Sequence, residues 1–187
     1  MMIIEHVEIY GLAESIKASG FPKGNDDINY SRVERLGSCS TGTGHDCFLK
    51  GITVQADITA PQYFWLQFGR YHFADIVSSE SKMHTILEMD LDEKCNEYVN
   101  AGIIGILKNM IEEHKADPCS YGFQRIVASC PMGLMLKARI TTNYLQLKTI
   151  LQQRKNHKLV EWRMFCQWVE ELPEFKVLTQ RGTSIES

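Results

Sequence analysis

The segment GRYHFADIVSSESKMH, residues 69–84, gathers groups that bind anions directly after the most apolar stretch of the chain. The guanidinium of Arg70 can hold a phosphate through two hydrogen bonds, and His72 points to the same side if the backbone is extended there. Further donors for phosphate or sugar oxygens are Ser78, Ser79, Ser81 and Lys82. The segment predicts a site for an anionic small molecule. The alternative is a loop in which Glu80 forms a structural ion pair with Lys82 or Arg70.

A second basic group occupies RKNHKLVEWR, residues 154–163. Arg154 and His157 are three residues apart, and Lys158 follows Arg154 by one helical turn. Residues at these spacings share one face of a helix. The group therefore predicts a second cationic surface, and the alternative interpretation is a solvated face between two helices.

Composition and charge limit the classes of function. The chain has 187 residues, enough for one domain with a real core, and its net charge of -3 argues against a protein that binds nucleic acid. No run of about 18 apolar residues and no signal peptide is present, so we expect a cytoplasmic protein without a membrane partner. The six cysteines lack CxxC spacing, and His45 with Cys47 has no second paired cluster, so no metal site is expected.

Hydrophobic periodicity and turn residues predict the elements that position these groups. Strands are expected over 5–11, 51–59 and 134–141; helices over 12–19, 32–36, 61–71, 93–113, 143–155 and 159–172; and loops over 22–44 and 115–124. Because strands and helices do not alternate regularly, the pattern predicts an α+β fold with a mainly antiparallel sheet. We expect a single domain over 1–178 and a flexible tail over 179–187.

Three helices carry specific expectations about burial. The helix over 61–71 is apolar nearly all round, so it is expected in a core or a subunit interface. The helix over 93–113 is expected to begin at an Asp92 cap and to bury one stripe, namely Val99, Ile103, Ile106, Leu107 and Met110. In the helix over 159–172, Trp162 and Trp168 are expected in the core.

The order of these motifs resembles the flavin-dependent thymidylate synthases, the ThyX family. That family has a Gly-His pair, a strand, a helix, the signature RHR-x7-S, and a late helix that ends in Arg before a His and a Trp-Glu pair. The corresponding features of this chain are Gly44-His45, a strand over 51–59, Arg70-Tyr71-His72, a cluster of Ser and Glu, Arg154, His157, and Glu161-Trp162. The resemblance covers roughly residues 44–84 and 130–170, and the spacing matches better than the identities.

The resemblance implies a twisted, mainly antiparallel sheet flanked by helices, assembled as a homotetramer with sites between subunits. It also implies FAD and dUMP as ligands, with NADPH and methylene-tetrahydrofolate if the chain is catalytic. The residues implied as cofactor contacts are Arg70, His72, His45 and Ser78. Those implied as substrate contacts are Arg154, Lys82, Ser79 and His157. Those implied as catalytic are Ser81 and Glu80.

Departures from the signature leave three functions open. Tyr71 and His72 replace the central His and the last Arg, Glu80 falls on the signature Ser unless one residue is inserted, and Gly51 replaces a second His. The first function is a divergent thymidylate synthase. The second is a homologue without catalysis that binds or sequesters a nucleotide or dinucleotide-like signal, as small phage-type proteins do. The third is an interaction protein whose aromatic helix is an interface.

Overall fold

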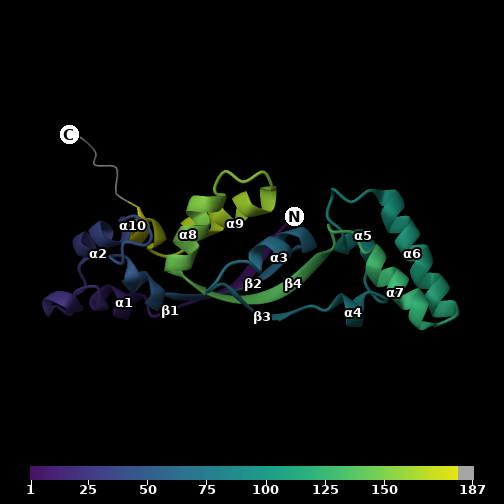
Figure 1. Cartoon of the computed structure of the whole chain (residues 1–187), viewed down its shortest axis with the longest axis horizontal. Helices are drawn as coiled ribbons and strands as arrows, with labels where there is room; N and C mark the ends of the chain where they lie inside the picture. The colour runs from purple at the N-terminus through teal and green to yellow at the C-terminus, as the bar shows by residue number, and fades with distance from the viewer. Residues whose placement is uncertain (181–187) are drawn as a thin grey trace. The chain divides into compact units, whose positions relative to one another are not determined.

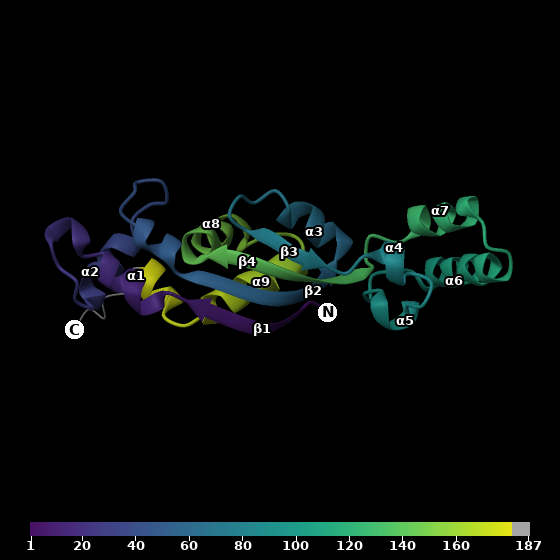
Figure 2. The ribbon, with the colours of Figure 1, turned by 90° about the horizontal axis from the view of Figure 1, so that it is seen from below.

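The computed structural model describes residues 1–180 and has an α+β fold with a four-stranded antiparallel sheet flanked by helices. The strands, in the sheet order β1-β2-β4-β3 (Figure 2), are β1 Ile3–Tyr10, β2 Thr53–Pro61, β4 Met135–Asn143 and β3 Asp75–Ser79. This result confirms the predicted fold class. The three predicted strands are present, and β3 is an additional one. None of the helices formed by residues 1–180 is both long and apolar enough to cross a bilayer.

Contact density divides the chain into two compact units, and each is described by itself. Unit 1 comprises residues 1–5, 57–71 and 76–140, and unit 2 comprises residues 6–56, 72–75 and the chain from 141 onward. The helices of unit 1 are α3 Gln62–Phe68, α4 Lys82–Thr85, α5 Leu91–Lys94, α6 Ala101–Ala116 and α7 Ser120–Ser129. Those of unit 2 are α1 Leu12–Ala18, η1 Phe21–Lys23, α2 Tyr30–Gly37, η2 Cys47–Gly51, α8 Tyr144–Arg154, α9 Val160–Glu171 and α10 Phe175–Thr179.

The predicted helix over 93–113 begins in the wrong place. In the structure, Asn100 caps α6 by accepting a hydrogen bond from the Gly102 N–H at 2.8 Å. The short helix α5 precedes it. Cys95, which lies between the two helices in the sequence, forms an antiparallel β-bridge with Leu134. Asp92 therefore lies inside α5 rather than at the start of α6.

The apolar stripe predicted for α6 is also wrong in part. Leu107 and Ile111, one turn apart, are buried in the core of unit 1, whereas Ile103 and Ile106 are 46% and 63% exposed. The buried face of α6 packs against α7, and the two helices lie side by side in both views (Figures 1 and 2). α7 occupies much of the segment predicted as a loop. Cys119 caps this helix, because its sulfur accepts a hydrogen bond from the Gly122 N–H.

The aromatic helix α3 is buried on one face only. Phe64 and Phe68 are fully buried, with ring centroids 5.8 Å apart. Leu66 is 65% exposed in the single chain, so this side of the helix is outside the core, and its burial in a subunit interface stays a prediction. Gly69 ends α3 by donating its N–H to the Trp65 carbonyl at 2.9 Å. The next residues form a turn, so the extended backbone that would point Arg70 and His72 to the same side is not observed.

Unit 2 is built around aromatic side chains. Trp162, Phe165 and Phe175 are fully buried, as is Tyr144, whose hydroxyl donates to the Pro173 carbonyl at 2.6 Å. Burial raises the pKa of Tyr144, so its hydroxyl remains a donor at neutral pH. Trp162 is in the core as predicted, whereas Trp168 is half-buried.

The structure describes the first two residues of the predicted tail, Thr179 and Gln180. Thr179 ends α10, is buried, and donates its hydroxyl to the Phe175 carbonyl at 2.6 Å. The rest of the predicted tail, from residue 181 onward, lies outside the described residues.

Candidate functional site

Two hollows of unit 1 share lining residues at the end of β3. The first, called the apolar pocket below, has a volume of about 260 Å³ and is lined by Gln62, Trp65, Leu66, Ile76, Ser79, Glu80, Met132 and Leu136. The second, called the polar groove below, has a volume of about 570 Å³ and is lined by Asp57, Thr59, Ser78, Ser79, Glu80, Lys94, Lys137, Ala138 and Arg139. Ser79 and Glu80, two of the predicted site residues, line both hollows.

Strand alternation explains why charged residues line the polar groove. Side chains of a strand point alternately to the two faces of a sheet. On β2, Ile58 is fully buried and Asp57 lies on the opposite face; on β4, Ala138 is buried between Lys137 and Arg139. Because β2 and β4 are neighbours in the sheet, Asp57 reaches both cations, with Oδ2 3.5 Å from Lys137 Nζ and Oδ1 3.1 Å from Arg139 Nη1.

Glu80 is held by three protein groups. Its two carboxylate oxygens accept hydrogen bonds from Lys94 Nζ at 3.1 and 3.2 Å, and Oε2 also lies 3.3 Å from the backbone N–H of Lys137. Its own N–H donates to the Lys137 carbonyl at 2.7 Å. Glu80 therefore forms its ion pair with Lys94. The alternative interpretation of the sequence expected Lys82 or Arg70 as the partner, and this expectation is wrong.

Two side chains that line the apolar pocket, Trp65 and Gln62, are fixed by hydrogen bonds. The Trp65 indole N–H donates to the Ala60 and Leu136 carbonyls at 3.1 and 3.0 Å. The Gln62 amide donates to the Pro131 carbonyl at 3.0 Å and accepts from Lys82 Nζ at 3.1 Å. Lys82, a predicted substrate contact, is thus placed beside the pocket. These bonds hold the indole and the amide in fixed orientations.

Ser81 and Arg70 line neither hollow. Ser81 precedes α4, and its carbonyl accepts the Thr85 hydroxyl at 3.0 Å. Arg70 follows α3 in unit 1 and is exposed, and its side chain forms no hydrogen bond or ion pair with any residue between 1 and 180. Arg70 is therefore available to a ligand.

His72 belongs to unit 2, in a turn that contains a strained residue. The next residue, Phe73, has a positive φ of 61° and is 72% exposed, both of which are unfavourable for a bulky apolar side chain. The Phe73 carbonyl accepts the Thr142 hydroxyl at 2.9 Å, which holds the turn in place. His72 itself is exposed.

Arg154 ends α8 and His157 lies in the turn before α9, so the helical face that their spacing predicted is not formed, although both side chains contact Trp162. The Arg154 guanidinium lies 4.9 Å from the centroid of the Trp162 ring. His157 Nδ1 accepts the Leu159 N–H at 3.1 Å, so the proton of the neutral ring is on Nε2. Burial, followed by the charges of Arg154, Arg163 and Lys158, lowers the pKa of His157. The turn is a local concentration of positive charge.

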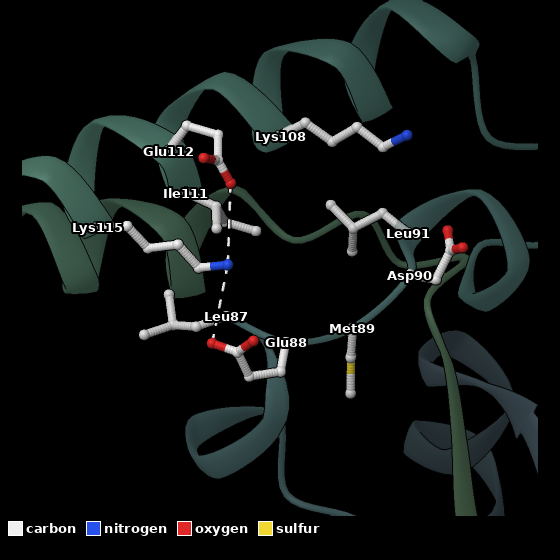
Figure 3. A pocket seen from close by; sticks show the side chains of 9 residues that line it. All are labelled: Leu87, Glu88, Met89, Asp90, Leu91, Lys108, Ile111, Glu112 and Lys115. Carbon is white, nitrogen blue, oxygen red and sulfur yellow. Dashed lines mark ion pairs between the residues drawn. The ribbon is translucent and has the colours of Figure 1, made fainter.

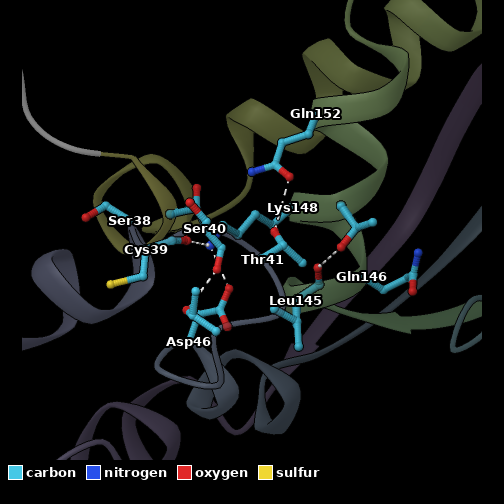
Figure 4. A network of polar contacts seen from close by, with 12 residues as sticks. Ser38, Cys39, Ser40, Thr41, Asp46, Leu145, Gln146, Lys148 and Gln152 are labelled. Carbon is cyan, nitrogen blue, oxygen red and sulfur yellow. Dashed lines mark hydrogen bonds and ion pairs between the residues drawn. The ribbon is translucent and has the colours of Figure 1, made fainter.

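His45 is exposed on a loop that is anchored to α8 by a buried ion pair. The neighbouring Asp46 binds Lys148 Nζ at 2.6 Å, and both side chains are nearly inaccessible. Lys148 also donates to the Cys39 carbonyl at 2.6 Å, and Thr41 donates to Gln152 at 3.1 Å (Figure 4). Residues 148 and 152, one turn apart on α8, therefore hold both ends and the middle of the loop.

The sequence pattern did not identify the residues that line the polar groove, except Ser78, Ser79 and Glu80. The alternating segments around Asp57 and around Lys137 and Arg139 carried the signal, since opposite charges on neighbouring strands pair across a sheet. Within residues 1–180, no group of three His, Cys, Asp or Glu residues is arranged to hold a metal ion.

A third hollow of unit 1 contains none of the predicted site residues. It measures about 400 Å³, and its apolar wall is formed by Leu87, Met89, Leu91 and Ile111 (Figure 3). Lys115 lies 3.7 Å from a carboxylate oxygen of Glu88 and 3.8 Å from one of Glu112. Lys108, which also lines this hollow, pairs with Asp92 outside it.

Comparison with known proteins gives a match in structure but not in sequence. No protein-family model and no curated protein sequence matches the chain. A crystal structure of the flavin-dependent thymidylate synthase ThyX from Helicobacter pylori, complexed with FAD and dUMP, matches with a TM-score of 0.71 and 15% identity, over 94% of this chain and 95% of that chain. A second structure of that enzyme, also with FAD and dUMP, gives 0.69 and 15% identity over 94% of each chain. The chain therefore has the fold that the sequence resemblance implied.

Proposed function

We propose that the chain is a ThyX-like nucleotide-binding protein and that the nucleotide binds where the apolar pocket and the polar groove meet. The observation that supports this proposal is that Ser79 and Glu80 line both hollows. A nucleotide has a flat, largely apolar ring joined to a hydrophilic sugar phosphate, so it needs two such environments side by side. The structural neighbours, which contain FAD and dUMP, support the same class of ligand.

The apolar pocket takes the ring in this proposal. Trp65, Ile76 and Met132 offer an aromatic and aliphatic surface against which a planar ring packs. Gln62 and Ser79 provide polar groups at the edge, which can bind ring oxygens and N–H groups. Because Gln62 is fixed by Pro131 and Lys82, its amide is preorganised.

The phosphate is proposed to contact cations that the fold leaves accessible. Arg70 in unit 1 and Arg154 in unit 2 are the proposed contacts, with assembly into a homotetramer bringing ligand-binding residues together between subunits. Lys82, held by Gln62 at the edge of the pocket, is a third contact. His45, His72 and Ser78 are the proposed contacts of a second ligand, FAD.

Binding without turnover is the function we favour, and the carboxylate of Glu80 is the reason. Glu80 stands where the ungapped signature has Ser, and its oxygens are engaged by Lys94 and by the Lys137 N–H. A carboxylate whose two oxygens already accept hydrogen bonds from the protein is poorly placed to act on a ligand, because those oxygens would first have to leave their partners. The protein would then bind or sequester a nucleotide or a dinucleotide-like signal.

A flavin-dependent thymidylate synthase is the second candidate, supported by the fold shared with ThyX. FAD would supply hydride transfer, with NADPH and methylene-tetrahydrofolate as co-substrates. In this case Ser81 and Glu80 are the residues proposed to act at the reacting ring.

Analysis of the copurifying small molecule tests the proposal. The purified protein is denatured, and the released compounds are identified by mass spectrometry and absorbance. A nucleotide without flavin supports binding without turnover, and stoichiometric FAD with dUMP-dependent NADPH oxidation supports the enzyme. If no nucleotide is released and neither dUMP nor FAD binds to the protein, the proposed function is wrong.

A further inference from the structure

Every cation that lines the polar groove is paired with a carboxylate. Lys94 pairs with Glu80, Lys137 with Glu5 and Asp57, and Arg139 with Asp57. Three positive groups thus face three negative groups, and their formal charges cancel. Lys137 has a raised pKa, chiefly because of its hydrogen bond to Glu5, so it stays charged at neutral pH.

Binding of a phosphate in this groove would be electrostatically unfavourable. A phosphate carries a charge near −2 and would approach Asp57 and Glu80, whose side chains are only 18% and 19% exposed and therefore incompletely screened by water. To bind Lys94 or Arg139, it must also replace an existing carboxylate partner. A phosphate in the groove would therefore meet cations that are already paired, and it would lie near two carboxylates, those of Asp57 and Glu80.

A sugar matches the same network. Each hydroxyl can donate to a carboxylate and accept from a cation, so it can bind without separating an ion pair. The hydroxyls of Thr59, Ser78 and Ser79 add further donors and acceptors along the groove. An uncharged ligand part with several hydroxyls is therefore favoured over an anionic one.

We propose that the polar groove binds the sugar hydroxyls of the nucleotide and excludes its phosphate, and that Asp57 determines this specificity. The inference rests on the proposed function, since it concerns which part of the nucleotide the groove contacts. Specificity of this kind arises as much from a repulsive group as from attractive contacts. The phosphate is then left to cations outside the groove.

The first test compares 2′-deoxyuridine with its 5′-monophosphate by isothermal titration calorimetry. The ratio of their dissociation constants, nucleoside over nucleotide, is the phosphate gain. The double variant Lys94→Met with Glu80→Gln removes an ion pair without changing the net charge. We expect both affinities to fall together, about fivefold or more for the lost hydroxyl contacts, while the phosphate gain stays within about twofold. A phosphate gain that falls about tenfold or more would show that Lys94 holds the phosphate, and the inference would be wrong.

The second test uses Asp57→Asn, which removes the negative charge that pairs with Arg139 and Lys137. The groove then carries a net positive charge, and we expect the phosphate gain to rise about fivefold or more. Glu112→Gln, which changes the charge equally at the Lys115 pair, is the control and should leave the phosphate gain unchanged. An unchanged phosphate gain in Asp57→Asn would overturn the inference, even if the double variant failed to fold.

The two proposals fail in different ways. If neither probe binds to the wild-type protein, the proposed function fails and the inference falls with it. If both probes bind but the phosphate gain behaves opposite to these expectations, the chain binds nucleotides and the assignment of the groove alone is wrong. Thermal melting of each variant shows whether the fold is intact.

Discussion

Glu80 illustrates what single residues contribute to this account. In the sequence it stands among hydroxyls in a segment suited to anions, and its own charge is unfavourable there. In the structure it binds Lys94 and the Lys137 N–H, so its charge is neutralised within unit 1. The partner could not be predicted, because Lys94 is 14 residues away and lies on α5, a helix of four residues that the sequence did not indicate.

Arg70 and Arg154 are the two main phosphate contacts that we propose, and each can be tested by substitution. Replacing either with Ala should weaken binding of dUMP by about 1.5–3 kcal/mol, the range for hydrogen bonds to charged groups. Arg125→Ala is the matched control, since Arg125 is an exposed arginine over the Tyr121 ring on α7. Calorimetry measures the affinities, and an unchanged affinity in both variants would reject the two residues as ligand contacts.

His157 predicts a dependence of stability on pH. Its pKa is lowered in the folded protein, so the unfolded chain binds the proton more tightly. Neutral His157 therefore contributes stability that is fully present above its ordinary pKa of 6.5 and is lost as the pH falls through that value. Protonation at Nδ1 also breaks the hydrogen bond from the Leu159 N–H.

Urea denaturation of wild type and His157→Asn at several pH values checks this prediction. Asn can accept the Leu159 N–H but does not titrate, so the wild type should lose stability relative to the variant below pH 6.5. A difference between the two proteins that does not change with pH would contradict the prediction.

At the scale of elements, the start of α6 was predicted least well. Both Asp92 and Asn100 are good N-cap residues, and the sequence alone favoured the first. The choice was decided by the bridge between Cys95 and Leu134, a contact between distant residues that prevents one continuous helix. α7 was missed because Pro118 indicated a loop over 115–124, whereas the helix begins directly after it with Cys119 as the cap.

The cap of α6 can be tested directly. Asn100→Ala should lower the free energy of unfolding by about 1 kcal/mol, because the Gly102 N–H loses its acceptor. Asp92→Ala removes only an exposed ion pair with Lys108 and should have a smaller effect. Urea denaturation measures both, and a larger loss in Asp92→Ala would favour the helix start predicted from the sequence.

The loop that carries His45 depends on the buried pair of Lys148 and Asp46. Lys148→Met should destabilise the protein by about 3–5 kcal/mol, because it leaves the Asp46 charge buried without a partner. Lys155→Met is the matched control, since the Lys155 side chain is 60% exposed and its pair with Glu170 contributes about 0–1 kcal/mol.

Chemical denaturation of both lysine variants decides the role of this pair. Equal losses of stability would show that Lys148 does not anchor the loop. This pair could not be predicted, because its members are 102 residues apart and Lys148 lies among the apolar residues of α8.

For the whole molecule, the fold class could be predicted, and the site could be predicted in part. Three strands and most helices follow from local periodicity, and the order of motifs indicated the fold that the ThyX structures share. β3 was missed because all five of its residues are exposed, so it shows neither alternation nor an apolar run. The polar groove was missed because it is formed by residues from three strands and from α5, which come together only in the folded sheet.

The central claim is that a nucleotide binds where the apolar pocket and the polar groove share Ser79. Calorimetric titration of dUMP into the wild type and into Ser79→Leu tests it most directly, with Ser129→Leu, an exposed serine on α7, as the matched control. The account predicts binding to the wild type and the control, and at least about tenfold weaker binding to Ser79→Leu, because the leucine side chain fills the junction and removes a polar contact. Equal affinity of all three proteins for dUMP, or no binding to the wild type, would contradict it.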